Sequence, residues 1–226
     1  MYLLKKRPKS LQMKFKVTYY QKKEERINVI SHALGVVLSV IAFPFLVYKA
    51  CKTEEPLVIL SFVIYGGSMI LLYTASTLFH SAQNPKIRYY FNIFDHAAIY
   101  VLIAGTYAPV ALVVLQGSLG WTIFVLSWLF AIVGIFYKIF FIGRFQLLSV
   151  IVYVGMGWML VFVMRSLIQN FAVEGIRLLL LGGIFYSVGA VFFAIPKIPY
   201  NHAIFHLFVL LGSLSHFIAI YQFVLV

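Results

Sequence analysis

The chain has 226 residues, of which 63% are hydrophobic and 11% are charged, and its mean hydropathy is +0.98. About a quarter of the residues in an average soluble protein are charged, so this composition excludes an ordinary soluble globular fold. It indicates a polytopic membrane protein, in which each spanning helix needs roughly 20 mostly apolar residues. The single cysteine, Cys51, excludes an internal disulfide and a cysteine-based metal cage.

The net charge of +12 comes largely from the start of the chain, where nine of the eighteen basic residues lie in the first 26 positions. A basic tail next to a hydrophobic span is typical of a cytoplasmic segment that contacts anionic lipids. We expect no nucleic-acid binding, because no folded basic surface accompanies this tail. We therefore predict a basic cytoplasmic tail over residues 1–26 and a single membrane domain over residues 27–226. No cleavable signal peptide is expected, because the first apolar run begins near Ile27 and is long enough to span.

The rest of the chain consists of seven apolar stretches separated by short polar breaks. An all-α membrane protein, a bundle of seven transmembrane helices, is therefore predicted. The expected spans are residues 28–48, 57–80, 94–115, 119–138, 146–165, 176–195 and 202–225. Pro44 and Pro109 lie inside two of them and are expected to bend their helices.

The basic residues also predict the orientation of the bundle. Fourteen of the eighteen lie in the N-terminal tail and in the second, fourth and sixth loops, with Lys86 and Arg88 assigned to the second loop. Basic loops stay in the cytoplasm. The N-terminus is therefore predicted to be cytoplasmic and, with an odd number of spans, the C-terminus is predicted to lie outside.

Polar side chains are expected to gather near the cytoplasmic ends of the spans. Asp95 is the only acidic residue placed at or within a span, and such residues are functional candidates because burying them is costly. His80 ends the second span, Asp95 begins the third, and His202 and His206 begin the seventh. His32, early in the first span, lies at a similar depth.

The spacing of these residues indicates a metal site. His202 and His206 are separated by one helical turn, so both imidazoles can face one point, as in helical zinc sites. His80 would complete a three-histidine set with an open fourth position, which is typical of catalytic zinc. Asp95 could hydrogen-bond a metal-bound water or orient a ligand ring, and Ser76 lies one turn before His80.

Simpler interpretations exist for several of these residues. His202 and His206 could be a chance pair whose rings snorkel to the membrane surface, and Ser76 could bond to the carbonyl one turn back. His96 is expected to be an interfacial or packing residue. His216 lies about 15 Å along the helix from His206, too far to share a metal, and is expected to be a buried, hydrogen-bonded neutral histidine.

Four segments together resemble the hemolysin III family of bacterial membrane proteins, which belongs with the progestin and adipoQ receptors, adiponectin receptors included. They are "ERINVISHALG", "STLFHSAQ", "FDHAAIYVLIAGTYAP" and "HAIFHLFVLLGSLSHF". The resemblance runs from about Glu25 to the C-terminus and implies a seven-helix bundle in the bacterial plasma (inner) membrane, with zinc near the inner face. It implies zinc ligands His80, His202 and His206, with Asp95 bound through water and Ser76 nearby. Asn28 and His32 match an early-span element to which we assign no role.

The wider superfamily is proposed to comprise metal-dependent hydrolases that act on lipids. The resemblance therefore favours a zinc-dependent hydrolase of a lipid amide or ester, with membrane lipids as partners. The alternative is a receptor-like or membrane-homeostasis protein in which zinc is structural and no turnover occurs. A third possibility, the cytolysis that the family label suggests, requires an exported or inserting amphipathic segment, and we find none in the sequence.

Overall fold

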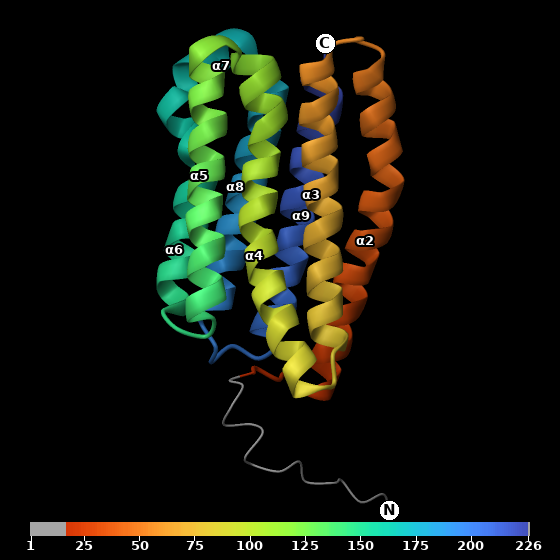
Figure 1. The fold of residues 1–226 in the computed structure, drawn as a ribbon, viewed down its shortest axis with the longest axis vertical. Coiled ribbons are helices and arrows are strands. Elements are labelled where there is room, and N and C mark those ends of the chain that lie inside the picture. Colours follow the sequence, from red (N-terminus) through yellow and green to blue (C-terminus); the bar gives the residue numbers. More distant parts are fainter. Residues whose placement is uncertain (1–16, 226) are drawn as a thin grey trace, which may run out of the picture.

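The protein is an elongated bundle of helices that run roughly along its long axis (Figure 1). The structure, a computed structural model, describes residues 17–225. Within that range, seven helical segments are long and apolar enough to cross a membrane. The elements are α2 (Lys22–Cys51), α3 (Pro56–Ser81), α4 (Pro85–Pro109), η1 (Val110–Leu115), α5 (Gly117–Phe141), α6 (Gln146–Gly157), η2 (Met159–Val163), α7 (Met164–Asn170), α8 (Val173–Ala194) and α9 (Asn201–Phe223). The predicted seven-helix class is confirmed.

Two helices, α2 and α4, begin at least six residues earlier than hydropathy predicts. α4 starts at Pro85, nine residues before the expected span, because the Asn84 side chain caps the backbone amides of Lys86 and Ile87 at 2.9 and 3.4 Å. Pro at the first helical position and Asn at the cap are a typical helix start. Lys86 and Arg88 therefore lie in a helix, and their assignment to a loop was wrong.

The start of α2 also precedes the expected first span, which begins at residue 28. The helix begins at Lys22, so its first turn includes Glu24 and Glu25. Acidic residues are favourable there because the amino end of a helix carries partial positive charge. The first 16 residues of the predicted basic tail lie outside the described residues.

The third and fifth spans are interrupted by irregular turns. After Pro109 the third span continues as the π-helix η1, and in the fifth span the 3₁₀-helix η2 joins α6 to α7. Proline lacks a backbone N–H and cannot continue the regular ladder, and irregular turns often lie at such positions. A π-helical turn thus follows Pro109, where a bend of the helix was expected.

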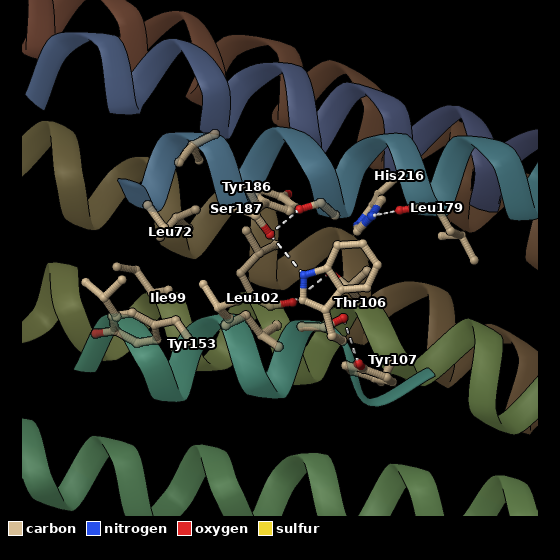
Figure 2. Close-up of a pocket in the computed structure, with 18 of the residues that line it drawn as sticks. Leu72, Ile99, Leu102, Thr106, Tyr107, Tyr153, Leu179, Tyr186, Ser187 and His216 are labelled. Atoms are coloured by element: carbon tan, nitrogen blue, oxygen red, sulfur yellow. Dashed lines mark hydrogen bonds between the residues drawn. The ribbon is translucent and has the colours of Figure 1, made fainter. Parts of the chain in front are cut away.

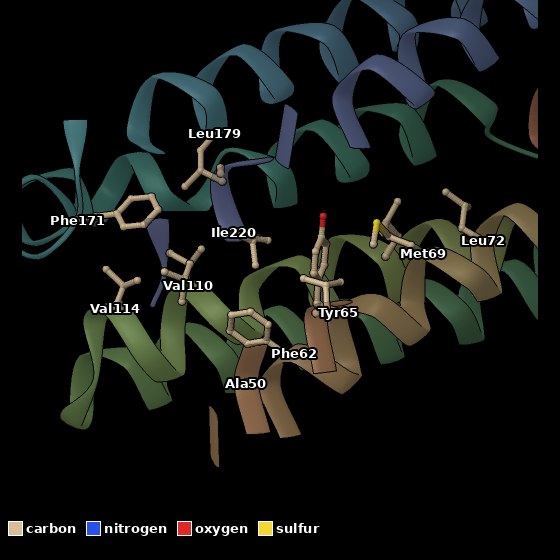
Figure 3. Packing of buried hydrophobic residues seen from close by; sticks show 14 of the residues in the cluster. Ala50, Phe62, Tyr65, Met69, Leu72, Val110, Val114, Phe171, Leu179 and Ile220 are labelled. Carbon is tan, nitrogen blue, oxygen red and sulfur yellow. The ribbon is translucent and has the colours of Figure 1, made fainter. Parts of the chain in front are cut away.

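Most of the core is apolar, and so is much of the surface. One buried cluster joins residues from several helices (Figure 3). Its labelled members include Ala50, Phe62, Tyr65, Met69, Val110, Phe171 and Ile220. On the outside, Ile30, Val133 and Phe140 are 66–72% exposed. Large exposed aliphatic and aromatic side chains on long helices fit a lipid-facing surface, so the chain is treated below as a multi-pass integral membrane protein.

The two ends of the described chain lie at opposite ends of the bundle (Figure 1), which an odd number of spans requires. α2 packs against both α3 and α9, and α8 packs against α9. Many of the buried polar residues gather at the end where α2 begins, α3 ends and α9 begins. They include Asn28, His32, Ser76, His80, Arg88, Asp95, His202 and His206. We call this the N-terminal end of the bundle.

Candidate metal centre

Three imidazoles converge at the N-terminal end of the bundle. His80 comes from the last turn of α3, and His202 and His206 come from the first two turns of α9. One ring nitrogen from each lies within 4.8 Å of the others. The Nε2 atoms of His80 and His202 are 3.1 Å apart, and all three residues are at most 3% exposed. The convergence predicted from their common depth is confirmed, and the cluster could hold a metal ion.

The Nδ1 atom of each imidazole contacts a side chain from one short segment, residues 20–31. His80 Nδ1 lies 2.8 Å from Glu25 Oε2. His202 Nδ1 lies 2.9 Å from Tyr20 Oη, and His206 Nδ1 lies 3.3 Å from Ser31 Oγ. Because a carboxylate can only accept, His80 Nδ1 carries the proton and its Nε2 presents a lone pair. Such outer partners fix the tautomer and the ring orientation of metal-binding histidines.

Glu25 is itself held by Arg88. The guanidinium pairs with Glu25 through Nη2, and its Nε donates to the Thr18 carbonyl at 2.9 Å. Its Nη1 donates to the carbonyls of Phe79 and His80 at 3.1 and 3.3 Å. Arg88 is 1% exposed. This residue therefore joins the residues before α2 to the end of α3, beside one of the three imidazoles.

Tyr20 covers the site from the segment that precedes α2. Its ring stacks on His202 with centroids 4.5 Å apart and an angle of 26° between the planes. Burial raises the pKa of Tyr20 well above its ordinary value, so the phenol keeps its proton. The Tyr20 hydroxyl oxygen can accept from His202 Nδ1 while its own proton remains available to another acceptor.

The two predicted catalytic residues lie in the wall of an adjoining cavity. Ser76 from α3 and Asp95 from α4 line it together with His32, His202 and His206. The Ser76 hydroxyl makes no hydrogen bond to the carbonyl one turn back in the described part of the chain. The simpler interpretation of Ser76 as a back-bonded serine is therefore wrong.

Two further histidines, His96 and His32, lie near the three imidazoles and have different contacts. His96 Nδ1 is 2.9 Å from the Asn92 carbonyl and 3.8 Å from an Asp95 oxygen. His32 stacks flat on His206, with centroids 3.5 Å apart and planes 8° apart. Neither ring nitrogen of His32 has a hydrogen-bond partner within the described chain. The expected depth of His32 is confirmed, and its ring holds the His206 ring in place by stacking.

Beyond the imidazoles the cavity continues between α4, α6, α8 and α9 (Figure 2). Its wall is mostly aliphatic and aromatic, with Leu72, Ile99, Leu102 and Tyr153 among the labelled residues. His216 lies in the same wall, ten residues along α9 from His206. The cavity thus joins a polar group of side chains to a long apolar space, as ligand sites commonly do.

The comparison with known proteins agrees with this architecture. The protein-family model described as "Haemolysin-III related" matches residues 20–217. The chain belongs to the hemolysin III family. It is 48% identical over 203 residues to "Hemolysin-3" of Bacillus cereus, covering 90% of this chain and 93% of that protein. A "Hemolysin-3 homolog" of Bacillus subtilis is 48% identical over 198 residues, covering 88% and 93%. The human "Monocyte to macrophage differentiation factor" is 28% identical over 216 residues, covering 93% and 87%.

The hemolysin III match begins at residue 20 and so includes the segment that contacts the imidazoles. Sequence analysis missed Tyr20, Glu25, Ser31 and Arg88 because it assigned the first two to a charged tail and the last to a loop. The signal that could have found Arg88 was present, since Asn84 followed by proline marks a helix start.

Proposed function

We propose that this hemolysin III protein is a zinc-dependent membrane hydrolase that cleaves an amide or ester bond of a lipid. The observation that supports this most strongly is the cluster of three buried imidazoles, two of which, His202 and His206, line an apolar cavity. An apolar lining favours the binding of acyl chains. A cluster of neutral imidazole nitrogens favours the binding of a metal such as zinc, which can catalyse hydrolysis.

The donor set fits zinc. Three imidazole nitrogens suit this metal, and nitrogens on a tetrahedral zinc at about 2.0–2.1 Å would be about 3.3 Å apart. The observed separation of His80 Nε2 and His202 Nε2 is 3.1 Å. In the proposal His80, His202 and His206 are the zinc ligands, and a three-histidine set leaves the fourth position open to water or substrate. Bound there, zinc would lower the pKa of its water toward about 7.

In this proposal Asp95 and Ser76 perform the proton transfer and the orientation of the substrate. The Asp95 carboxylate accepts a proton from the attacking water and returns it to the nitrogen or oxygen of the leaving group. The water oxygen forms a new bond to the acyl carbon, and the amide or ester bond breaks. The Ser76 hydroxyl donates a hydrogen bond to the carbonyl oxygen as negative charge develops on it.

The proposed substrate comes from the membrane in which the protein lies. Membrane lipids are the proposed partners, and the acyl chain would occupy the cavity while its carbonyl group lies against the imidazoles. We place the protein in the bacterial plasma membrane, with the N-terminal end of the bundle at the cytoplasmic face. This placement rests on the basic residues in the tail and loops and on the bacterial relatives.

Purified protein with measured zinc content tests the proposal. Incubated with a panel of N-acyl and O-acyl lipids, the wild type should release fatty acid, detected by mass spectrometry. Asp95→Asn should keep the zinc and lose most of the release, and His80→Ala should lose both. Full release by His80→Ala would show that the three-histidine site is not the catalyst.

A second candidate function is a receptor-like or membrane-homeostasis protein in which the metal is structural. The contacts from Tyr20, Glu25 and Ser31 favour it, because a metal beneath them would join α2, α3 and α9. Removal of zinc by a chelator should then lower the melting temperature, and no lipid of the panel should be cleaved.

A further inference from the structure

The apolar cavity has a second polar feature, at some distance from the imidazole cluster. His216 lines the same cavity from α9. It lies ten residues after His206, so the two are separated by about 15 Å along the helix. A long acyl chain extending from the imidazoles would reach this distance.

The His216 ring is fixed in position. Its Nε2 lies 3.0 Å from the Leu179 carbonyl oxygen of α8 (Figure 2). Tyr186 packs edge-on against the ring, with centroids 5.3 Å apart. Gly182 gives the ring its space, because a Cβ atom there would lie 2.2 Å from His216 Cδ2. The expected hydrogen bond of His216 is confirmed, although the residue as a whole is partly rather than fully buried.

This geometry also fixes the tautomer. A carbonyl oxygen can only accept, so His216 Nε2 carries the proton, and Nδ1 of the neutral ring is a bare acceptor. Nδ1 is buried and has no hydrogen-bond partner among residues 17–225. A buried acceptor without a donor destabilises the fold, so a donor from outside the protein would be favoured here.

The neighbouring polar groups of the protein have other hydrogen-bond partners. Tyr186 Oη lies 2.8 Å from Ser213 Oγ, and Trp158 Nε1 donates to Ser187 Oγ at 2.9 Å. Ser187 Oγ in turn donates to the Gly183 carbonyl at 2.8 Å. A buried water normally needs two to four polar partners, and Nδ1 would offer it only one. A hydroxyl group on an apolar chain needs only one polar partner, because the rest of the ligand packs against the apolar wall.

We propose that His216 Nδ1 accepts a hydrogen bond from a hydroxyl group carried partway along the acyl chain of the lipid. The site would thus select hydroxylated acyl chains over plain ones. This inference rests on the proposed function in one respect, that the carboxyl end of the chain lies against the three imidazoles. It does not require that the lipid be cleaved.

Binding of three fatty acids tests the inference. Oleic acid has no hydroxyl, ricinoleic acid has the same chain with a hydroxyl near its middle, and α-hydroxyoleic acid has the hydroxyl beside the carboxyl group. Each competes with a fluorescent fatty acid for the purified full-length protein, with and without zinc. The wild type should bind ricinoleic acid roughly five- to tenfold more tightly than oleic acid, the gain of about one hydrogen bond. α-Hydroxyoleic acid should show no such gain.

Two variants assign the preference to His216. His216→Phe should bind oleic acid as the wild type does and lose the preference for ricinoleic acid. Tyr186→Phe is the matched control, because it keeps the ring beside His216 and removes only the hydroxyl that contacts Ser213. It should keep the preference. Equal binding of oleic and ricinoleic acid by the wild type, or a preference that survives His216→Phe, would overturn the inference. A clear preference without hydrolysis of any lipid would support it and count against the proposed hydrolase.

Discussion

Replacing Glu25 with glutamine should weaken zinc binding without removing any of the three imidazoles. The carboxylate accepts from His80 Nδ1 at 2.8 Å and pairs with Arg88. Glutamine keeps the size of the side chain and one oxygen, but it removes the negative charge that makes the imidazole a stronger donor to a metal. Loss of such an outer partner typically costs about 10- to 100-fold in metal affinity.

The structure places the expected loss near the lower end of that range. The Glu25 side chain is 18% exposed, so solvent already screens part of its charge, and the amide oxygen of glutamine can still accept from Nδ1. We therefore expect the zinc dissociation constant to rise about tenfold. Competition with a fluorescent zinc chelator, in detergent solution, measures this directly.

Glu24→Gln is the matched control. Glu24 is the neighbouring carboxylate on α2 and is also buried, but its Oε1 atom has no hydrogen-bond partner in the described part of the chain. This variant should bind zinc as the wild type does. Equal zinc affinities for Glu25→Gln, Glu24→Gln and the wild type would refute the argument that the Nδ1 contacts tune this site.

Stability must be measured separately, because Glu25 also neutralises Arg88. Hydrogen bonds to charged groups contribute about 1.5–3 kcal/mol, and Arg88 keeps its carbonyl acceptors. Glu25→Gln should therefore lower the melting temperature of both the zinc-free and the zinc-bound protein. If Glu25 only stabilised the fold, the variant would melt earlier but would bind zinc as tightly as the wild type.

Three further outcomes follow from the geometry of the site and the cavity. Tyr20→Phe keeps the ring stacked on His202 but removes its hydroxyl, so zinc affinity should fall about tenfold in the same chelator assay; unchanged affinity would show that this contact is incidental. Asp95→Asn should retain zinc, measured by elemental analysis, and lose at least about 100-fold in fatty-acid release; a smaller loss would assign the base elsewhere. Gly182→Ala forces a methyl group against the His216 ring and should cost about 1–3 kcal/mol in thermal unfolding; an unchanged melting temperature would mean that the ring moves freely.

The fold and the three-histidine cluster were predictable because they depend on properties that a sequence displays directly. Hydropathy identifies the seven spans. His80 and His202 lie at the same depth in their spans, and the packing of the helices places their rings next to each other. The i, i+4 spacing of His202 and His206 then places two rings on one face.

The partners of the imidazoles were not predictable in the same way. Tyr20, Glu25 and Arg88 lie at helix ends among other polar residues, where hydropathy does not separate a buried charge from a solvated one. Whether Glu25 or the adjacent Glu24 faces His80 depends on how α2 is rotated about its axis, and helix packing fixes this rotation. The position of His216 was not predictable for the same reason. Its hydrogen bond was expected, but its place in the cavity wall depends on how α8 and α9 pack.

The rate of fatty-acid release as zinc is returned to chelator-treated protein tests the proposed hydrolase most directly. The account predicts no release without zinc and a rate that rises with added zinc until each chain holds one ion. Stoichiometric zinc binding that stabilises the fold, with no release from any amide or ester lipid, would contradict it and assign the metal a structural role.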